Sequence, residues 1–374
     1  MNILWFIDKE LDLSFSTSAR IAGVKYLEKK HSVSLISGYK DREKDFEIKG
    51  CIYFLKKINL PFLKTASFYR QQLKFIDNYE RLNGVDIILL NSSNLFLFRK
   101  LLKLKKRYGF KVILDVRTLP VDSNPLKRWI NDFFLRKSLH LAARNFEGIT
   151  YITEEMKKFC LSNYNLPEHS FQIWGSGVDP QIFKPSISHL SSREYRLMYH
   201  GQVARNRGLQ GVIQALNILG DEEICFHILG AGEGLVEMKK LTKKLGLEGR
   251  VLFHSPVSLS EVPYYINSIH AGILPFPHWR GWNTSSPLKL FEYLACGKPV
   301  IATDIPAHSN VLKGKDFVFW ISGSSPERIA SAIREAKERK TEYRRLAEEA
   351  RKFVEMNFTW ERQVKKLEEF LEGL

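Results

Sequence analysis

The sequence predicts an α/β protein with two Rossmann-like, doubly wound parallel-sheet domains that face each other across a cleft. Three observations predict this class. Apolar segments of strand length recur along the 374 residues, helix-like segments separate them, and they form two sets of about equal size. Continuous apolar strands that alternate with helices are typical of parallel sheets covered on both faces.

Each half of the chain is expected to contribute six strands. The first set is 3–7, 32–36, 51–54, 86–90, 111–114 and 148–152, and the second is 196–199, 224–229, 250–253, 271–274, 299–302 and 317–320. Residues 178–195 are rich in proline and serine and predict the junction. We expect domains at 1–178 and 179–354, with a C-terminal helix at 355–374 crossing back to the first domain.

Composition favours a cytoplasmic protein. The four cysteines, Cys51, Cys160, Cys225 and Cys296, are far apart, which argues against a disulfide framework or a cysteine zinc site. The opening "MNILWFID" is too short and lacks the basic lead of a signal peptide, and no apolar run reaches membrane-spanning length.

The net charge of +16 is uneven. Residues 1–185 hold 31 Lys and Arg against 19 Asp and Glu, a net of +12, and the remainder carries +4. A strongly basic half favours an anionic partner, such as nucleic acid, a membrane surface or a phosphorylated substrate.

A polar loop follows the strand at 196–199, in "HGQVARNRGLQGVIQAL". Gly201 ends the strand, and Arg205 and Arg207 precede the next helix. Two guanidinium groups at a strand-to-helix turn can bind a diphosphate through paired hydrogen bonds. A solvated basic loop explains this stretch equally well.

A glycine-rich turn, "HILGAGEG", follows the strand at 224–229 and contains Gly230, Gly232 and Gly234. The third glycine comes one position early for a dinucleotide fingerprint, and the next strand ends without an acidic residue. The turn therefore disfavours an NAD site but is typical of a backbone that approaches a nucleotide.

The segment "NTSSPLKLFEYLACGKPV" predicts a short helix. Ser285 or Ser286 is expected to cap it, and Pro287 suits its first position. The positive end of the helix would face an anion, Lys289 would add a charge, and Glu292 would accept hydrogen bonds from sugar hydroxyls. The alternative is a surface Lys–Glu pair three residues apart.

These segments together resemble the retaining glycosyltransferases of the GT-B fold, family four (glycosyl transferases group 1). Four stretches match in the family's order and cover about residues 149–306. They are "WGSGVDPQIFKP", "YHGQVARNRGL", "FHILGAGEG" with "LGLEGRVLFHSPVSLSEVPYYINSIHAGILPF", and "SPLKLFEYLACGKPVIATDIP". The first half matches only in its general pattern.

The resemblance implies roles for the second domain. Glu292 corresponds to the glutamate that holds the donor's ribose, and Arg207 to the basic residue on the diphosphate. Gln202 stands where an arginine is usual, so Arg205 is expected to supply its charge, and Thr284 stands in place of the motif's first glutamate. The predicted catalytic set is Arg205, Arg207, Lys289 and Glu292, and the predicted donor-binding set is Gly201, Gly230, Gly232, Thr284, Ser285, Ser286, Pro287 and Leu288.

On the acceptor side, the resemblance points to two groups in the first domain. Asp115 and Arg117 stand where the family has cleft residues, and Ser16, Thr17 and Ser18 stand where it often has glycines. A strand end and a helix cap are the structural alternatives.

The resemblance implies transfer of a sugar from a nucleotide-diphosphate sugar to a saccharide or lipid-linked acceptor, with retention, in cell-surface glycan synthesis. Such a hexosyltransferase needs neither a metal nor a cofactor besides its donor if basic groups stabilise the leaving diphosphate. Two alternatives are an epimerase or inverting transferase using His200, His254 or His278, and a binder of nucleic acid using the basic run at 98–110. The latter run also has a buried helix face, so no nucleic acid is expected.

Two basic, apolar stretches of the first half, 124–145 and 60–75, have helical spacing. Basic amphipathic helices with aromatic residues bind membrane interfaces, although each stretch alone also fits a helix packed on a sheet. Together with the charge of this half, they predict a peripheral protein on an anionic membrane surface.

Overall fold

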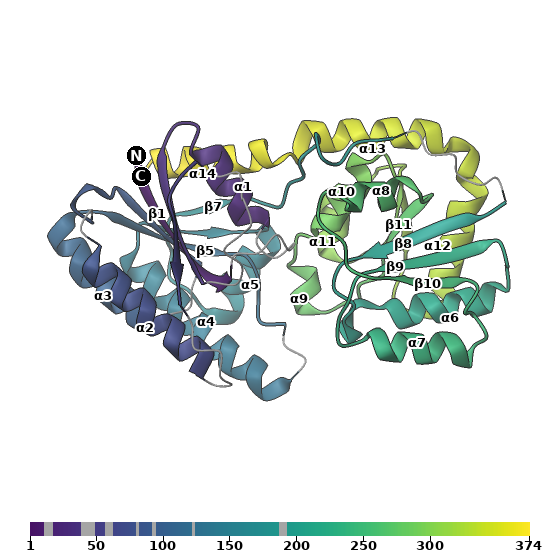
Figure 1. Ribbon diagram of the computed structural model, residues 1–374, viewed down its shortest axis with the longest axis horizontal. Helices are drawn as coiled ribbons and strands as arrows, with labels where there is room; N and C mark the ends of the chain where they lie inside the picture. The colour runs from purple at the N-terminus through teal and green to yellow at the C-terminus, as the bar shows by residue number, and fades with distance from the viewer. Residues whose placement is uncertain are drawn as a thin grey trace. The chain divides into compact units, whose positions relative to one another are not determined.

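The computed structural model describes residues 1–10, 18–38, 49–56, 63–79, 82–91, 95–121, 124–186 and 193–374. The chain divides into two compact units. The first unit is Met1–Gly175 with Trp360–Leu374, and the second unit is Ser176–Thr359. Each unit contains a parallel sheet flanked by helices (Figure 1), which confirms the predicted fold class.

The limits of the units differ slightly from the expected domains. The first unit ends at Gly175 rather than at residue 178, and the second runs on to Thr359. The tail is not one helix from residue 355, because α13 (Tyr343–Asn357) ends in the second unit and α14 (Trp360–Glu372) belongs to the first. There α14 packs against α1 and the last strand of the sheet.

The sheet of the first unit has the strand order β3-β2-β1-β4-β5-β6-β7 in the described residues. Its strands are β1 (Asn2–Glu10), β2 (Ser32–Gly38), β3 (Ile52–Leu55), β4 (Ile87–Leu90), β5 (Lys111–Val116), β6 (Gly148–Tyr151) and β7 (Phe171–Ile173). Each expected strand corresponds to one of these, and the three-residue β7 was not expected. All neighbouring strands pair in parallel.

The helices of the first unit cover both faces of its sheet. They are α1 (Ser18–Leu27), α2 (Leu63–Asn78), α3 (Leu95–Tyr108), α4 (Pro125–Asn145) and α5 (Glu154–Tyr164), besides α14, with a 3₁₀ turn at Leu82–Gly84. Figure 1 shows α1 and α14 together on one side and α2, α3 and α4 on the other. Trp5 and Trp174 are fully buried, with ring centres 6.1 Å apart.

The sheet of the second unit has the order β10-β9-β8-β11-β12-β13. Its strands are β8 (Tyr195–His200), β9 (Ile224–Leu229), β10 (Val251–His254), β11 (Ala271–Leu274), β12 (Val300–Thr303) and β13 (Val318–Ile321). The full burial of β11 and β12 agrees with the apolar runs from which they were predicted, whereas β10, at the edge of the sheet, is buried only at Val251. The order reverses between β8 and β11, which makes this the point where ligands bind in open parallel sheets.

The helices of the second unit form two groups. They are α6 (Leu209–Leu219), α7 (Leu235–Lys244), α8 (Val262–Asn267), α9 (Arg280–Asn283), α10 (Leu288–Ala295), α11 (Pro306–Leu312), α12 (Pro326–Glu338) and α13, with 3₁₀ turns at Arg205–Arg207 and Arg339–Glu342. Helix α6 packs against α7 and α12, and α10 packs against α13. In the chain, β11 ends at Leu274 and α10 begins at Leu288, with only the short helix α9 between them.

Candidate active site

The carboxyl ends of β8 and β11 bring together the chemistry predicted for the donor. β8 ends at His200 and leads through Gly201 into the 3₁₀ turn Arg205–Arg207. β11 ends at Leu274 and leads through α9 into α10. The two segments carry Arg207, Lys289 and Glu292 into one cluster.

Arg207 lies over aromatic rings. Its guanidinium carbon is 4.0 Å from the ring centre of Trp282 and 5.3 Å from that of Phe276. The indole nitrogen of Trp282 donates a hydrogen bond of 2.8 Å to the carbonyl of Asn206, which fixes the ring beside the arginine. The Nε atom of Arg207 is buried and has no hydrogen-bond partner in the described part of the chain. Sequence reasoning missed Phe276 and Trp282, although their position just after β11 was an available signal.

Lys289 shares this aromatic wall. Its Nζ lies 5.0 Å from the ring centre of Tyr199 and 5.6 Å from that of Phe276. Burial, together with the charge of Arg207, lowers the pKa of Lys289 below its usual range. A side chain at Gly201 would approach this amine, because a Cβ built there lies 3.6 Å from Nζ. Two basic side chains beside the same Phe276 ring favour an anion near them.

Glu292 supplies a buried carboxyl group. The residue is 4% exposed, and its Oε2 atom has no hydrogen-bond partner in the described part of the chain. The Nε2 atom of His200 lies 3.2 Å from Oε2. Burial raises the pKa of Glu292, and burial together with the charge of Lys289 holds the pKa of His200 well below its usual range. The histidine is therefore neutral and does not compensate an ionised Glu292.

The amino end of α10 differs from the prediction. Pro287 occupies the cap position itself, and α10 begins at Leu288 without a side-chain cap. Neither Ser285 nor Ser286 caps the helix. Because a helix leaves its first N–H groups without internal partners, this end can donate hydrogen bonds to a bound anion.

The hydroxyl groups before α10 already have hydrogen-bond partners elsewhere than at the end of the helix. Thr284 is buried, and its hydroxyl donates to the carbonyl of Arg280 at 2.9 Å, while that of Ser285 donates to the carbonyl of Trp282 at 2.8 Å. The Ser286 hydroxyl accepts a hydrogen bond of 3.3 Å from a backbone amide, that of Ser176. These bonds explain why the serines do not cap α10, and they hold the approach to the helix in a fixed shape.

The glycine turn joins two loops to each other. A Cβ at Gly230 would lie 2.0 Å from the carbonyl oxygen of Gly201, and one at Gly232 would lie 2.3 Å from that of Val203. Both glycines also have positive φ angles, +147° and +158°. Glycine is therefore required at both positions because the loops after β8 and β9 contact each other. The sequence alone predicts a different reason, the close approach of a nucleotide to the backbone.

Arg205 does not join the cluster around Arg207. Its guanidinium lies 2.7 Å from a carboxylate oxygen of Glu237 on α7, and its side chain is 60% exposed. The expectation that Arg205 replaces the missing arginine of the family motif is therefore at odds with its position. A 3₁₀ turn has three residues per turn, so residues two apart point in different directions.

The acceptor-side residues have structural partners in the first unit. The carboxylate of Asp115 accepts hydrogen bonds from Thr150 at 2.7 Å, from the Trp174 indole at 2.9 Å and from Asn91 at 2.5 Å. Arg117 donates to the carbonyls of Trp174 and Gly175 and lies 3.9 Å from the Trp174 ring centre. These bonds support a structural role. Ser16 and Thr17 lie outside the described residues, as does the side chain of Ser18, which begins α1.

The other two histidines of the epimerase alternative lie in pairs of their own. His254 stacks on His227, with Nε2 and Nδ1 3.0 Å apart, and His278 is 3.0 Å from the carboxylate of Asp304. The cluster itself combines two cations, a helix amino end and a buried carboxyl group. It can bind a diphosphate and accept hydrogen bonds from ring hydroxyls.

Comparisons with known proteins agree with this chemistry. Residues 181–353 match the family model described as glycosyl transferases group 1. The Methanocaldococcus jannaschii protein MJ1069, an uncharacterized glycosyltransferase, is 23% identical over 293 residues, which are 75% of this chain and 71% of that protein. The Bacillus subtilis protein TuaH is 38% identical over 77 residues, but these are only 20% of this chain and 19% of that protein.

A solved structure shows the same fold over the whole chain. Anabaena Alr3699/HepE, crystallised with UDP and glucose, superposes with a TM-score of 0.78 at 15% identity and covers 100% of both chains. The match of the family model lies within the second unit, whereas the match of the fold covers both units. Residues 181–353 thus resemble a group 1 glycosyl transferase domain, and the chain has the GT-B fold seen in solved glycosyltransferases.

Proposed function

We propose that the protein transfers a hexose from a nucleoside-diphosphate sugar to a saccharide or lipid-linked acceptor in cell-surface glycan synthesis, with retention of configuration and without a metal ion. The donor site is the cluster around Glu292. The C1–O bond to the diphosphate breaks, the acceptor oxygen bonds to C1, and the nucleoside diphosphate and a proton are released.

The observation that carries this proposal is a pair of incompletely bonded buried groups. Both Nε of Arg207 and Oε2 of Glu292 lack hydrogen-bond partners in the described chain. Buried polar atoms are nearly always paired in folded proteins, and exceptions call for an explanation. A nucleoside diphosphate supplies both missing partners, because its phosphate oxygens accept from the arginine and its ribose hydroxyls donate to the carboxylate.

The charges of the cluster suit the leaving group. Negative charge grows on the diphosphate as the glycosidic bond breaks, and Arg207, Lys289 and the amino end of α10 are fixed near one another before the reaction. Fixed positive groups of this kind stabilise a developing charge without rearrangement. They take the place that a divalent metal has in other transferases, which supports metal-free transfer.

The related structure gives a starting point for substrates. HepE was crystallised with UDP and glucose, so UDP-sugars are the first donors to test. Retention rests on the motif resemblance to retaining enzymes. A panel of UDP-, GDP- and ADP-sugars, scored by thermal stabilisation and by slow hydrolysis, identifies the donor, and NMR of the anomeric carbon gives the stereochemistry. Failure of every nucleotide sugar to stabilise the protein would contradict the proposal.

We also propose that α4 binds an anionic membrane surface, where a lipid-linked acceptor would lie. Five large apolar side chains of this helix are 39–66% exposed: Leu126, Trp129, Ile130, Phe133 and Phe134. The rings of Trp129 and Phe133 stack, and Lys137 lies 5.6 Å from the Phe133 ring centre. Lys127, Arg136 and Lys137 of the same helix are also exposed, and such basic groups are attracted to anionic lipid head groups. Among the described residues, no helix combines the length and the apolar character needed to cross a bilayer.

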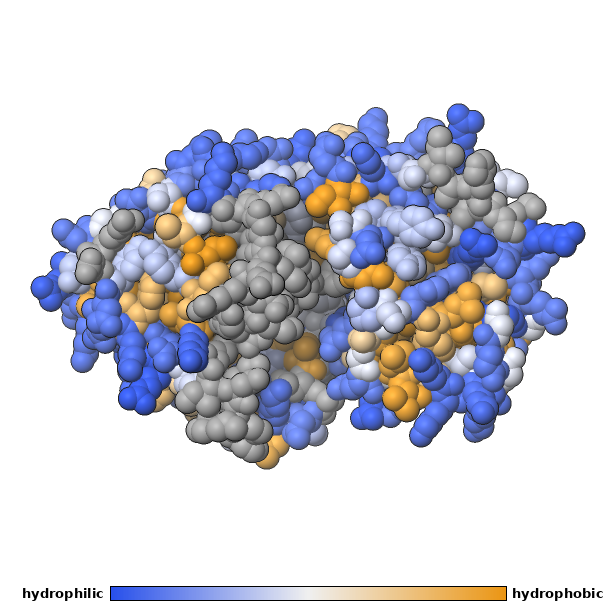
Figure 2. Space-filling view, viewed as in Figure 1, coloured by the Kyte–Doolittle hydropathy of each residue, from blue (hydrophilic) through white to orange (hydrophobic). Residues whose placement is uncertain are grey.

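Elsewhere, exposed apolar side chains are more dispersed. On the face shown in Figure 2, hydrophilic residues predominate, and a smaller hydrophobic area lies over α6 and α7, where Ile218 and Val236 are exposed. The second predicted membrane stretch is wrong for its described part. Phe68 of α2 is 2% exposed, and Leu73 and Phe75 pack against the core of the first unit. The basic run at 98–110, which was considered for nucleic-acid binding, lies largely on α3, and this helix has a buried face at Leu97, Phe98 and Leu101.

Vesicle sedimentation tests the membrane proposal. Binding to vesicles with anionic lipid, but not to neutral vesicles, is expected and should weaken as salt rises. Replacing Trp129 and Phe133 by alanine should reduce binding at least 10-fold, while Tyr264→Ala, which removes a 77% exposed aromatic from α8, should leave it unchanged. Equal loss in both variants, or no preference for anionic vesicles, would contradict it.

A further inference from the structure

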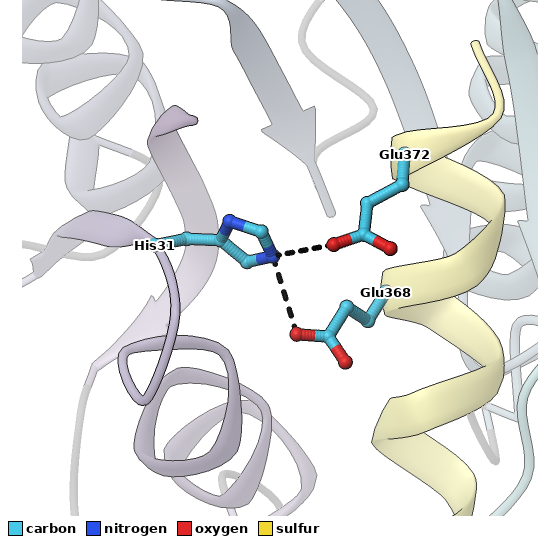
Figure 3. Close-up of side chains that lie close together, drawn as sticks. All are labelled: His31, Glu368 and Glu372. Carbon is cyan, nitrogen blue, oxygen red and sulfur yellow. Dashed lines mark ion pairs between the residues drawn. The ribbon is translucent and has the colours of Figure 1, made fainter.

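A second cluster lies in the first unit, where α14 packs beside the turn between α1 and β2. His31 occupies this turn, and its backbone amide bonds to Leu27 at the end of α1. Glu368 and Glu372 are four residues apart on α14, so they lie on one side of the helix. Figure 3 shows both carboxylates pointing at the same ring nitrogen of His31.

The distances fit a metal centre. The Nε2 atom of His31 lies 3.2 Å from Oε1 of Glu368 and 3.5 Å from Oε1 of Glu372. All three potential ligand atoms lie within 4.8 Å of one another. In a tetrahedral zinc site with bonds near 2.0 Å, neighbouring ligand atoms are about 3.3 Å apart. A zinc ion placed among these atoms therefore needs little movement of the side chains.

Burial provides a second, independent observation. The His31 side chain is 6% exposed, and its Nε2 atom is buried without a geometrically acceptable hydrogen bond in the described part of the chain, although two carboxylates face it. The other ring nitrogen, Nδ1, lies 3.4 Å from the α-amino group of Met1. Nε2 is therefore the ring atom available to a ligand between the carboxylates.

The charges of the cluster also fit. A neutral imidazole and two carboxylates carry two negative charges, which balance a divalent ion, and this N/O donor set suits Zn²⁺. Lys30 binds Oε2 of Glu368 at 3.2 Å and leaves Oε1 facing His31. The side chain of Glu368 is 12% exposed and that of Glu372 is 46% exposed, so the site opens to solvent beside Glu372, where water can complete the coordination.

We propose that His31, Glu368 and Glu372 bind one Zn²⁺ ion that ties the C-terminal helix α14 to the α1–β2 turn. This site is separate from the donor site and does not depend on the proposed function. Because the ion joins segments more than 300 residues apart in the chain, it acts as a structural staple of the first unit.

The test is titration of the full, chelator-treated chain with Zn²⁺ alone, followed by calorimetry and by thermal unfolding. One zinc ion per chain is expected, with a rise in the melting temperature. His31→Gln and Glu372→Gln should each weaken binding at least 10-fold. Two matched controls should bind like the wild type: Glu369→Gln, which alters an exposed carboxylate of α14, and His278→Gln, which alters a histidine that faces one carboxylate.

The visible spectrum of bound Co²⁺ gives a reading that does not depend on stability, so a variant that unfolds more readily can still be assessed at low temperature. Tetrahedral cobalt bands in the wild type, absent in Glu372→Gln, are expected. The proposal fails if the wild type binds no zinc, since the carboxylates then face His31 without a metal ion between them. It also fails if the two ligand variants bind zinc as tightly as the controls.

Discussion

Each unit has a buried carboxyl group near the carboxyl ends of its parallel strands, but the two groups differ in their hydrogen-bond partners. Asp115 lies near the end of β5 and accepts bonds from Thr150, Trp174 and Asn91. Glu292 lies on α10, and its Oε2 atom accepts none in the described chain. The first carboxylate is complete within the protein, whereas the second is completed only by a ligand.

This difference in hydrogen bonding indicates which of two similar α/β units carries a binding site. A buried and fully bonded carboxylate stabilises its unit, and removing it leaves several donors without partners. A buried carboxyl group with an unmet oxygen and a raised pKa is a cost to stability that is retained for binding or catalysis. The number of hydrogen-bond partners therefore distinguishes Asp115 from Glu292, although their exposed fractions, 3% and 4%, are nearly the same.

The largest expected effect comes from exchanging the two carboxylates for amides. Glu292→Gln should lower kcat/KM for the nucleotide sugar about 10²–10³-fold, because it replaces one of the two carboxylate oxygens that accept from the ribose hydroxyls by an amide donor. Its free energy of unfolding should be unchanged or higher, since the amide avoids burial of an ionisable group. Steady-state kinetics and urea unfolding measure the two quantities.

Asp115→Asn should show the opposite pattern. The new amide faces the amide of Asn91, so one hydrogen bond is lost and two donors face each other, which costs about 1–3 kcal/mol of unfolding free energy. Transfer per folded molecule should stay within a few-fold of the wild type. If Asp115→Asn abolishes transfer in a fully folded protein, Asp115 touches substrate, and the contrast between the units is wrong.

A second comparison, between the two arginines of one loop, should give the next largest effect. Arg207→Ala is expected to lower kcat/KM about 10²-fold, because it removes a fixed positive charge beside the diphosphate. Arg205→Ala should change it less than about three-fold, since this side chain pairs with Glu237 in solvent. Equal losses in the two variants would show that Arg205 turns toward the donor on binding.

The fold could be predicted from the sequence because its strands are continuous apolar runs. Burial on both faces requires such runs, so local composition is enough to locate them. The short β7 could not be predicted in this way, because Phe171–Ile173 is neither long nor fully buried. Its place at the sheet edge depends on pairing with β6 and on packing of α14, which are contacts distant in sequence.

The site was predicted in part. Local signals placed Arg207, Lys289 and Glu292 near strand ends, where the topology then brought them together. The sequence could not tell which arginine points inward, because this depends on the 3₁₀ turn and on Glu237 of another helix. It could not distinguish the role of Asp115 either, since its donors come from other strands and from a tryptophan 59 residues away.

Acid should weaken the second unit more than the first. Burial lowers the pKa of His227 to about 4, of His270 to about 3 and of His308 to about 4. An unfolded histidine binds its proton near pH 6.5, so between about pH 6.5 and pH 4 the unfolded chain holds more protons, and stability falls as pH falls. Each histidine ring lowers the free energy of unfolding by at most about 3 kcal/mol over this pH range, and by less where water reaches the ring.

Hydrogen exchange near pH 7 and pH 5, corrected for intrinsic rates, measures this effect by unit. Protection in β8–β13 should fall more than protection in β1–β6. His308→Gln should reduce the pH dependence of the second unit, because it removes a buried ring whose Nδ1 lies 2.8 Å from the carbonyl of Thr303. Equal losses of protection in the two units would contradict the prediction that acid weakens the second unit more than the first.

The smallest expected effect concerns chelation. Arg207, Lys289 and the amino end of α10 already supply positive charge to the diphosphate, so EDTA should leave kcat within about two-fold. The zinc site of the first unit complicates this test, because its loss can lower the amount of folded protein. His31→Gln separates the two effects, since its transfer no longer depends on zinc. If EDTA abolishes transfer in this variant and Mg²⁺ or Mn²⁺ restores it, a metal takes part in the reaction, and the cations of the second unit do not suffice.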